Sequence, residues 1–269
     1  MKPLSKDLTV AQFTLPTPKL TAPVRLALLA DLHSSRYGEA QERLLGMLRP
    51  LQPDLVFLAG DIVDDIEPAT GADELLSVLG AEYRAYYVSG NHEARTGRLD
   101  EIKKSVAAHG VRVLDGRRDE VRLRGQRVCV CGIDDRSLGR DEFARQLGAA
   151  FDGVSRDVYT ILLTHRPEPA KQYTRFPCDL ILAGHTHGGQ VRIPALRFGL
   201  YASGQGLFPR YSAGMYTVGD AKLLVSRGLS LISPHAPRLL RVPRIFNPPQ
   251  IVAVTLTPPA SPSPLSGET

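Results

Sequence analysis

The residues in this sequence that could do chemistry are histidines and carboxylates placed directly after apolar runs. Residues 184–189 read GHTHGG and follow the apolar run 180–183, which is typical of a buried strand. In extended backbone, residues two apart point the same way, so the imidazoles of His185 and His187 could converge on one spot. The flanking glycines allow a sharp turn and a close approach of main chain to a ligand. This segment is therefore a candidate metal site, and a solvated polar loop is the alternative.

Four further apolar runs end in residues of the same kinds. Asp31 and His33 follow the run 24–30, Asp61 and Asp64 follow 54–59, Asn91 and His92 follow 84–89, and His165 follows 158–163. Ligands of open α/β sheets bind beyond the carboxyl ends of the strands, so these loops can share one crevice. Five of the seven histidines of the chain lie in such loops, which argues against coincidence.

The ligand types restrict the metal. Carboxylates, imidazoles and one amide, without a thiolate, suit hard or borderline ions such as Mn²⁺, Fe or Zn²⁺. The candidate ligands are more numerous than the positions around one tetrahedral ion. Two ions about 3.5–4 Å apart that share a carboxylate would use all of them. The three cysteines (Cys129, Cys131 and Cys178) lack the spacing of a zinc site or a disulfide framework, so we expect buried thiols.

The elements that must position these residues alternate along the first 190 residues. Helices are expected at 39–48, 72–79, 98–109 and 141–147, an edge strand at 8–15, a short strand at 111–114 and a hairpin at 121–131. Continuous apolar runs are typical of strands buried on both faces, as in parallel sheets. Residues 199–214 read as a long loop, and 215–218, 222–226 and 251–256 as strands of a second, more antiparallel layer. We predict a single α/β domain over 1–256 and a disordered Pro/Ser-rich tail over 257–269.

Taken together, the polar blocks resemble the calcineurin-like metallophosphoesterase superfamily. The blocks are DLH at 31–33, GD at 60–61, GNHE at 90–93, TH at 164–165 and GHTH at 184–187. The stretch GHTHGGQVRIP (184–194) and the segments RGL (227–229) and NPPQI (247–251) resemble a narrower bacterial branch of phosphodiesterases. The resemblance implies a four-layer α/β/β/α sandwich of two mixed sheets flanked by helices, with a dinuclear metal site at the carboxyl ends of the strands.

The resemblance also implies a role for each residue. One metal would bind Asp31, His33, Asp61 and His187, and the second would bind Asp61, Asn91, His165 and His185, with Asp61 bridging. The cofactors would be two divalent ions, Mn²⁺ favoured and Zn²⁺ or Fe as alternatives. His92 would stabilise the phosphoryl oxygens or protonate the leaving alkoxide, and Asp64 would orient His92. Glu93 is expected at the surface or in a supporting role.

The implied reaction is hydrolysis of a phosphodiester or pyrophosphate bond. Two divalent ions lower the pKa of a water between them and neutralise the phosphoryl oxygens, so that hydroxide can attack near neutral pH. A phosphate-ester small molecule or a lipid is the expected substrate, with a phospholipid or a nucleotide-sugar lipid considered first. The alternatives are a nuclease or a phosphomonoesterase with the same site, or a catalytically inactive metal-binding scaffold. Nucleic acid is ranked lower because no aromatic stacking platform is visible.

Arginine residues are the candidates for binding the substrate phosphate. The candidates are Arg36, Arg95 and Arg210. Arg192 also lies near a metal-binding loop and could hold a phosphate. The net charge of +5 resides in 179–269, where eight Lys/Arg face three acidic residues, so this third of the chain could contact an anionic membrane or simply face water. No signal peptide or transmembrane segment is visible, so we expect a cytoplasmic location, with peripheral contact at the inner membrane surface as an option.

Overall fold

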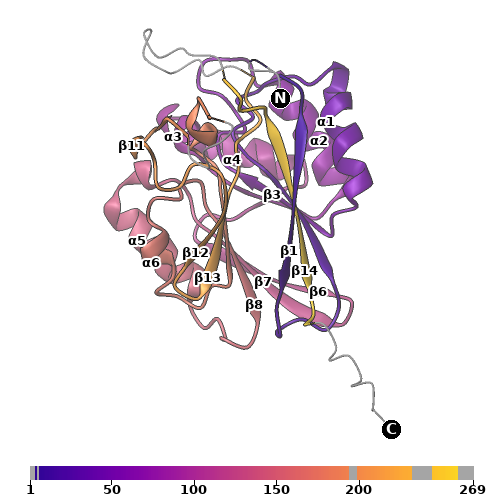
Figure 1. Ribbon diagram of the computed structural model, residues 1–269, viewed down its shortest axis with the longest axis vertical. Helices are drawn as coiled ribbons and strands as arrows, with labels where there is room; N and C mark the ends of the chain where they lie inside the picture. The colour runs from indigo at the N-terminus through magenta and orange to yellow at the C-terminus, as the bar shows by residue number, and fades with distance from the viewer. Residues whose placement is uncertain (1–3, 5, 194–198, 232–243, 260–269) are drawn as a thin grey trace.

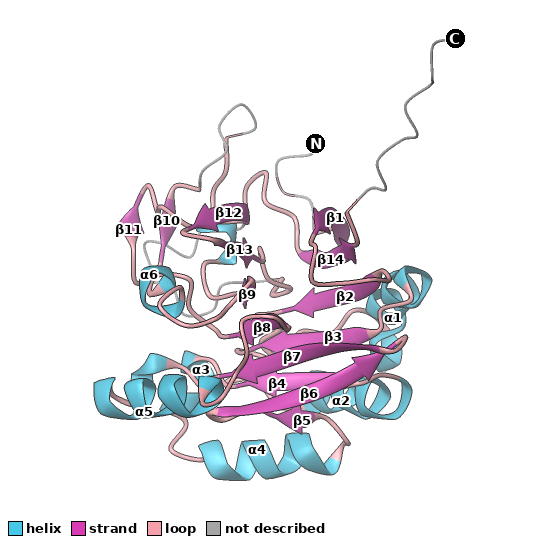
Figure 2. Cartoon of the chain, turned by 90° about the horizontal axis from the view of Figure 1, so that it is seen from below, coloured by secondary structure: helices cyan, strands magenta, loops and turns pink. Residues whose placement is uncertain are grey.

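The computed structural model of the protein describes residues 4, 6–193, 199–231 and 244–259. Two six-stranded mixed sheets pack face to face, and helices cover both outer faces (Figures 1 and 2). This arrangement confirms the four-layer α/β/β/α sandwich. None of the described helices combines the length and the apolar character that crossing a bilayer requires.

The first sheet has the strand order β1-β14-β2-β3-β4-β5. Its strands are β1 (Thr9–Pro16), β14 (Gln250–Thr257), β2 (Val24–Leu29), β3 (Leu55–Ala59), β4 (Ala85–Val88) and β5 (Arg112–Val113). The strands from β2 to β5 are parallel, so the chain segments that follow β2, β3 and β4 all leave the sheet at one edge. The first strand lies at the edge of the sheet, as predicted.

The second sheet has the order β12-β13-β9-β8-β7-β6. Its strands are β12 (Gly214–Val218), β13 (Ala221–Val225), β9 (Leu180–Ala183), β8 (Tyr159–Leu163), β7 (Gln126–Gly132) and β6 (Arg117–Leu123). The four central strands are parallel, and the two outer strands are antiparallel to their neighbours. The loop predicted at 199–214 contains a small hairpin of β10 (Tyr201–Ala202) and β11 (Gly206–Leu207).

Helices pack on the outer face of each sheet (Figure 2). Those on the first sheet are α1 (Glu42–Leu48), α2 (Thr70–Glu82) and α4 (Leu99–Ala108), and those on the second are α5 (Arg140–Phe151) and the single-turn α6 (Ala170–Tyr173). A further short helix, α3 (Asn91–Arg95), follows β4 directly. Sequence reasoning did not anticipate α3 or α6, since a helix of one turn carries no measurable periodicity.

The continuous apolar runs are explained by burial on both faces of each strand. In β3, Phe57 packs between the two sheets, while Val56 and Leu58 pack against the helices of the first sheet. Each fully buried side chain of this size contributes about 1.5–3 kcal/mol relative to exposure. The strands that carry the site are therefore held rigidly from both sides.

The last strand is placed differently from the prediction. Residues 251–256 were expected in a second, more antiparallel layer, but β14 lies in the first sheet between β1 and β2. In the second sheet, β13 pairs in parallel with β9, and only β12 is antiparallel to β13. The apolar pattern of a segment indicates that it forms a strand, but it does not determine which strand it pairs with. Of the tail predicted from 257, residues 260–269 lie outside the described residues, and Thr257 is the last residue of β14.

Ending the chain after Pro249 should abolish the cooperative folding of the domain. This truncation removes β14, whose two neighbours β1 and β2 then lose their backbone hydrogen bonds together. The expected result is the loss of a sharp thermal unfolding transition measured by circular dichroism. A chain that ends after Pro259 retains β14 and is the matched control, with an expected change in Tm of less than about 2 °C. Equal melting of the two truncations would contradict this assignment of β14.

Candidate metal centre

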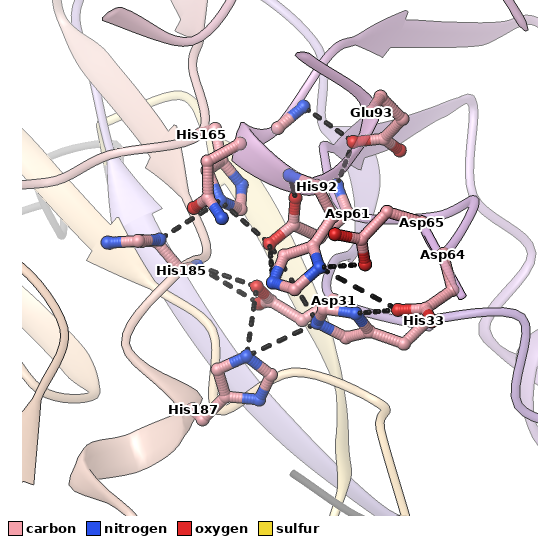
Figure 3. A network of polar contacts seen from close by, with 12 residues as sticks. Asp31, His33, Asp61, Asp64, Asp65, His92, Glu93, His165, His185 and His187 are labelled. Atoms are coloured by element: carbon pink, nitrogen blue, oxygen red, sulfur yellow. Dashed lines mark hydrogen bonds and ion pairs between the residues drawn. The ribbon is translucent and has the colours of Figure 1, made fainter. Parts of the chain in front are cut away.

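The carboxyl ends of five strands bring the predicted ligands together between the two sheets. The loops after β2, β3 and β4 contribute residues from the first sheet, and the loops after β8 and β9 contribute residues from the second. Figure 3 shows the side chains converging on one another. The groups whose ligand atoms lie within 4.8 Å of one another include Asp31/His33/His187, Asp61/His165/His185 and His33/Asp61/His92.

Asp61 lies in the middle of this arrangement. Its Oδ2 is 3.1 Å from Nε2 of His165 in one group and 3.8 Å from Nε2 of His33 in the other. Its Oδ1 accepts a hydrogen bond of 2.8 Å from the backbone N–H of His92, at the beginning of α3. One carboxylate therefore faces both groups, which is the geometry that two ions sharing a ligand require.

The donor set on the second sheet fits a cation. His165 Nδ1 donates to the carbonyl oxygen of Ala59 at 2.8 Å, so Nε2 is the nitrogen that faces the site and would coordinate a metal after losing its proton. His165 Nε2 is 3.1 Å from His185 Nδ1 and 3.2 Å from Asn91 Oδ1. A divalent cation among these atoms would satisfy all three lone pairs at once, and imidazole and amide oxygen are suitable ligands for it.

The backbone at the ligands is largely left-handed. Five predicted ligands have φ between 46° and 72°: Asp31, His33, Asp61, His185 and His187. This conformation costs a residue with a side chain about 1–2 kcal/mol, and it persists only where the surroundings enforce it. The clustering of this strain at the strand ends marks them as a functional site.

His185 and His187 belong to different groups, contrary to the argument from their spacing. Both have positive φ, and a 3₁₀ turn begins at His187, so the backbone between them is not extended. His185 Nδ1 faces His165, whereas His187 Nε2 lies 3.4 Å from His33 Nε2. The two imidazoles therefore serve opposite ends of the site instead of one spot.

Burial and mutual charge set the protonation of the ligands. Burial raises the pKa of Asp31 to about 6 and lowers the pKa of His185 and His187 well below the usual value for histidine. Burial would also raise the pKa of Asp61, but the neighbouring His165 holds it well below the usual range, and Asp61 in turn raises the pKa of His165 to about 10 against the effect of burial. Neutral imidazoles and a charged carboxylate are the states that bind a metal, so His185, His187 and Asp61 are ready to bind, whereas a metal would have to displace a proton from His165.

Glu93 is a supporting residue at the centre of the site and not a surface residue. Its side chain is fully buried, and its carboxylate accepts hydrogen bonds from four backbone N–H groups, those of Asp61 (2.9 Å), Ile62 (2.7 Å), Val63 (3.1 Å) and Gly90 (2.9 Å). These bonds fix the loops after β3 and β4 relative to each other. Glu93 thereby determines where the bridging carboxylate lies.

The carboxylate partner of His92 differs from the prediction. His92 Nδ1 lies 2.8 Å from Asp65 Oδ1 and 3.8 Å from Asp64 Oδ1. Asp64 makes its short contact, 2.8 Å, with Nδ1 of His33. Asp64 is thus placed to orient a predicted metal ligand, and Asp65 is placed to orient His92. Because the two carboxylates are adjacent in sequence, only the backbone turn between them distinguishes these tasks.

The three predicted phosphate-binding arginines lie in different surroundings. Arg36 forms an ion pair with Glu74 and lines a cavity of about 520 Å³ that His33 also lines. One end of the Asn91 amide lies 3.2 Å from Arg95 Nη2, so Arg95 is beside the site. Arg210 packs over the ring of Tyr211 in a separate pocket.

Two further arginines contact the histidines directly, and sequence reasoning did not select either of them for the site. Arg166 Nη1 lies 3.0 Å from His185 Nε2, while its Nε donates to Asp135 Oδ2 at 2.7 Å. Arg244 Nη2 lies 3.3 Å from His187 Nδ1. The position of Arg166 immediately after His165 was an available signal. No local pattern marks Arg244.

Replacing Gly90 with alanine should displace the bridging carboxylate. A Cβ at this position would lie 2.1 Å from Asp61 Oδ1 and 2.4 Å from its backbone nitrogen, so Asp61 must move. We expect metal content, measured on purified protein by mass spectrometry, to fall below one ion per chain, with a loss of about 1–3 kcal/mol in stability. The control Gly46→Ala meets no atom within 4 Å and should stabilise α1 by about 0.5–1 kcal/mol. Full metal content in Gly90→Ala would contradict the placement of Asp61.

Comparisons with known proteins agree with this geometry. The family model for calcineurin-like phosphoesterases matches residues 24–189. An uncharacterized metallophosphoesterase of Bacillus subtilis, YkuE, is 27% identical, covering 86% of this chain and 78% of its own length. A transmembrane protein with a metallophosphoesterase domain from Danio rerio is 31% identical over 62% of this chain, and the chain spans 41% of its length.

Among solved structures, the phosphopantetheinyl hydrolase PptH of Mycobacterium tuberculosis has a similar fold. The TM-score is 0.51 at 15% sequence identity, covering 78% of this chain and 92% of that one. The family model spans all five strand ends whose residues converge in Figure 3. The chain therefore belongs to the calcineurin-like phosphoesterase family and is a metal-dependent phosphoesterase.

Proposed function

We propose that the protein hydrolyses a phosphodiester with the aid of two divalent metal ions. One ion would bind Asp31, His33, Asp61 and His187, and the other would bind Asp61, Asn91, His165 and His185. The observation that carries this proposal is the position of Asp61 Oδ2 between His33 and His165, at 3.8 Å and 3.1 Å. Mn²⁺ is our first choice of metal, because carboxylate oxygen and imidazole ligands together suit it.

The ions would supply positive charge to the phosphoryl oxygens and a nucleophile derived from water. The residues of the chain would orient the substrate and move the proton. His92 is the candidate for proton transfer, because its Nε2 lies 3.9 Å from Asp61 Oδ2 and its ring is next to that of His33. Asp65 accepts from Nδ1–H, so Nε2 faces the site. With a second proton on Nε2, the imidazolium that Asp65 stabilises could donate to a phosphoryl oxygen or give this proton to the leaving alkoxide.

An exposed apolar surface beside the metal centre favours a substrate with an apolar portion. The exposed side chains are Ile193 (51%), Leu200 (40%), Tyr201 (37%), Leu207 (67%) and Phe208 (63%). The hairpin carries or directly adjoins four of them, all except Ile193. It is tied to the histidine loop, since the backbone N–H of Leu200 donates to the carbonyl oxygen of Gly189 at 3.0 Å. Exposed apolar side chains grouped in this way are typical of interaction surfaces. A phospholipid or another lipid-linked phosphate ester, reached at a membrane surface, would fit.

Hydrolysis of bis-p-nitrophenyl phosphate and p-nitrophenyl phosphate tests the proposed reaction. Metal-stripped protein refilled with Mn²⁺, Zn²⁺ or Mg²⁺ should cleave the diester faster than the monoester, and saturating metal should raise Tm because it binds only the folded chain. His92→Ala should lower kcat by roughly 10²–10⁴-fold while two ions remain bound. Preference for the monoester would make the protein a phosphatase. Two bound ions without turnover of either ester would favour a binding scaffold.

The apolar hairpin should matter for lipid substrates. In the double variant Leu207→Ser/Phe208→Ser, we expect kcat/KM for a phospholipid in anionic vesicles to fall at least roughly tenfold relative to kcat/KM for bis-p-nitrophenyl phosphate, because two exposed apolar side chains no longer contact the bilayer. Vesicle sedimentation measures the binding separately. An unchanged ratio of the two rates would contradict a lipid-facing role for the hairpin.

A further inference from the structure

Three arginines gather behind His187, on the side facing away from His33. Arg192 and Arg244 are 9% and 6% exposed, and Arg227 is half-buried. Arg244 Nη1 donates to the carbonyl oxygen of Arg227 at 2.8 Å, and Arg192 Nη1 donates to that of Gly188 at 3.0 Å. The guanidinium of Arg244 thus contacts the outer side of one predicted metal ligand, and Arg192 and Arg244 lie close enough to Arg227 for their charges to lower its pKa.

The outer nitrogen of His187 has an unusual neighbour. A histidine that binds a metal through one nitrogen carries its proton on the other, which normally donates to a carboxylate or a carbonyl oxygen. The outer nitrogen of His33 faces Asp64 at 2.8 Å, and that of His165 faces the Ala59 carbonyl at 2.8 Å. His187 Nδ1 instead faces the guanidinium of Arg244 at 3.3 Å. With a metal on Nε2, both groups are donors, and an acceptor is needed to satisfy them.

His185 provides an informative comparison. Its Nε2 also faces a guanidinium, that of Arg166, but Glu168 Oε1 lies 3.6 Å away and Asp135 forms an ion pair with Arg166. Charge around His185 is therefore balanced by residues of the chain. Arg227 and Arg244 form no ion pair with a carboxylate of the described residues.

The arginine cluster also has unused hydrogen-bonding capacity. The Nε of Arg227 is buried and has no hydrogen-bond partner within the described part of the chain. Burial, together with Arg192 and Arg244, lowers the pKa of Arg227 to about 10, so it remains charged at neutral pH. Buried charge without a counter-ion is costly, and an anion in contact with the cluster would remove that cost.

We propose that Arg227, Arg244 and the outer nitrogen of His187 bind a second anionic group, a phosphate or a carboxylate, carried by the same substrate whose phosphoester lies at the metal centre. The inference rests on the proposed function, because it takes His187 as a metal ligand through Nε2. It narrows the substrate class to phosphate esters with a further negative charge beyond the scissile group. The guanidinium groups would bind this anion through charge-assisted hydrogen bonds.

Calorimetric titration of the metal-loaded full chain with two matched ligands tests the proposal. Propyl phosphate and propane-1,3-diol bisphosphate differ by one phosphate on a flexible linker. We expect the bisphosphate to bind the wild-type protein roughly tenfold more tightly or better, the effect of one or two charge-assisted hydrogen bonds. The ratio of the two dissociation constants, propyl phosphate over bisphosphate, should fall below about threefold in Arg227→Gln and Arg244→Gln. It should be partly restored in Arg227→Lys.

The controls separate the competing explanations. Arg127→Gln changes an exposed arginine at the opposite end of β7 and should leave the ratio as in the wild type. If Arg244→Gln does not fold, as judged by its thermal transition, Arg227→Gln decides the question, because the Nε of Arg227 has no hydrogen-bond partner among the described residues. Equal binding of the two ligands by the wild type, or a ratio that survives both substitutions, would overturn the proposal.

Two further measurements separate failure of the second anion site from failure of the proposed phosphoesterase function. Inorganic phosphate that binds as tightly as the bisphosphate, and in the same Arg227-dependent way, would indicate a free-anion site and overturn the assignment to the substrate. Bis-p-nitrophenyl phosphate has no second anionic group, so its hydrolysis reports on the proposed function alone. If the wild type cleaves it while the binding ratio stays near one, only the second site is refuted.

Discussion

The structure depends on keeping the carboxylate of Asp61 charged and almost fully buried between two sheets. An isolated buried carboxylate would take up a proton, because desolvation strongly disfavours the charge. Here His165 on one side, His33 on the other and the backbone N–H of His92 stabilise the negative charge. A pair of divalent ions would do so more strongly. The position of Asp61 therefore dictates where the other ligands must lie.

Hydrogen bonds to backbone groups hold this arrangement, in addition to the apolar packing of the strands. Glu93 binds the loops after β3 and β4 together by accepting four backbone hydrogen bonds. The ring of His165 joins the two sheets, since it bonds to the carbonyl oxygen of Ala59 across the interface. Glycines at 90 and 228 leave no room for a Cβ next to Asp61 and Asp31. The metal centre is thus preorganised by the two sheets and the loops that leave them.

Charge is layered around the centre. Carboxylates and imidazoles lie inside, and arginines lie outside them, against the outer nitrogens of His185 and His187. The net positive charge of the last third of the chain had suggested a basic surface facing a membrane or water. Three of its arginines (Arg192, Arg227 and Arg244) are instead drawn in behind the metal centre. In the proposed second site, excess positive charge at this depth would favour a polyanionic substrate over a singly charged one.

The sequence by itself determined the fold class and the set of converging residues. Each ligand follows a continuous apolar run, and parallel strands end at the same edge of a sheet, so the local pattern predicted ligands at strand ends, with Asp31, Asp61 and Asn91 on one sheet and His165 and His185 on the other. That the two sheets face each other was implied by the family resemblance of the motifs. Only the tertiary structure decided the neighbour of β14, the separation of His185 from His187, and the pairing of His92 with Asp65. It also decided the burial of Glu93 and Arg244. Each of these outcomes depends on a backbone turn or on contacts between segments distant in the chain, which neither periodicity nor composition records.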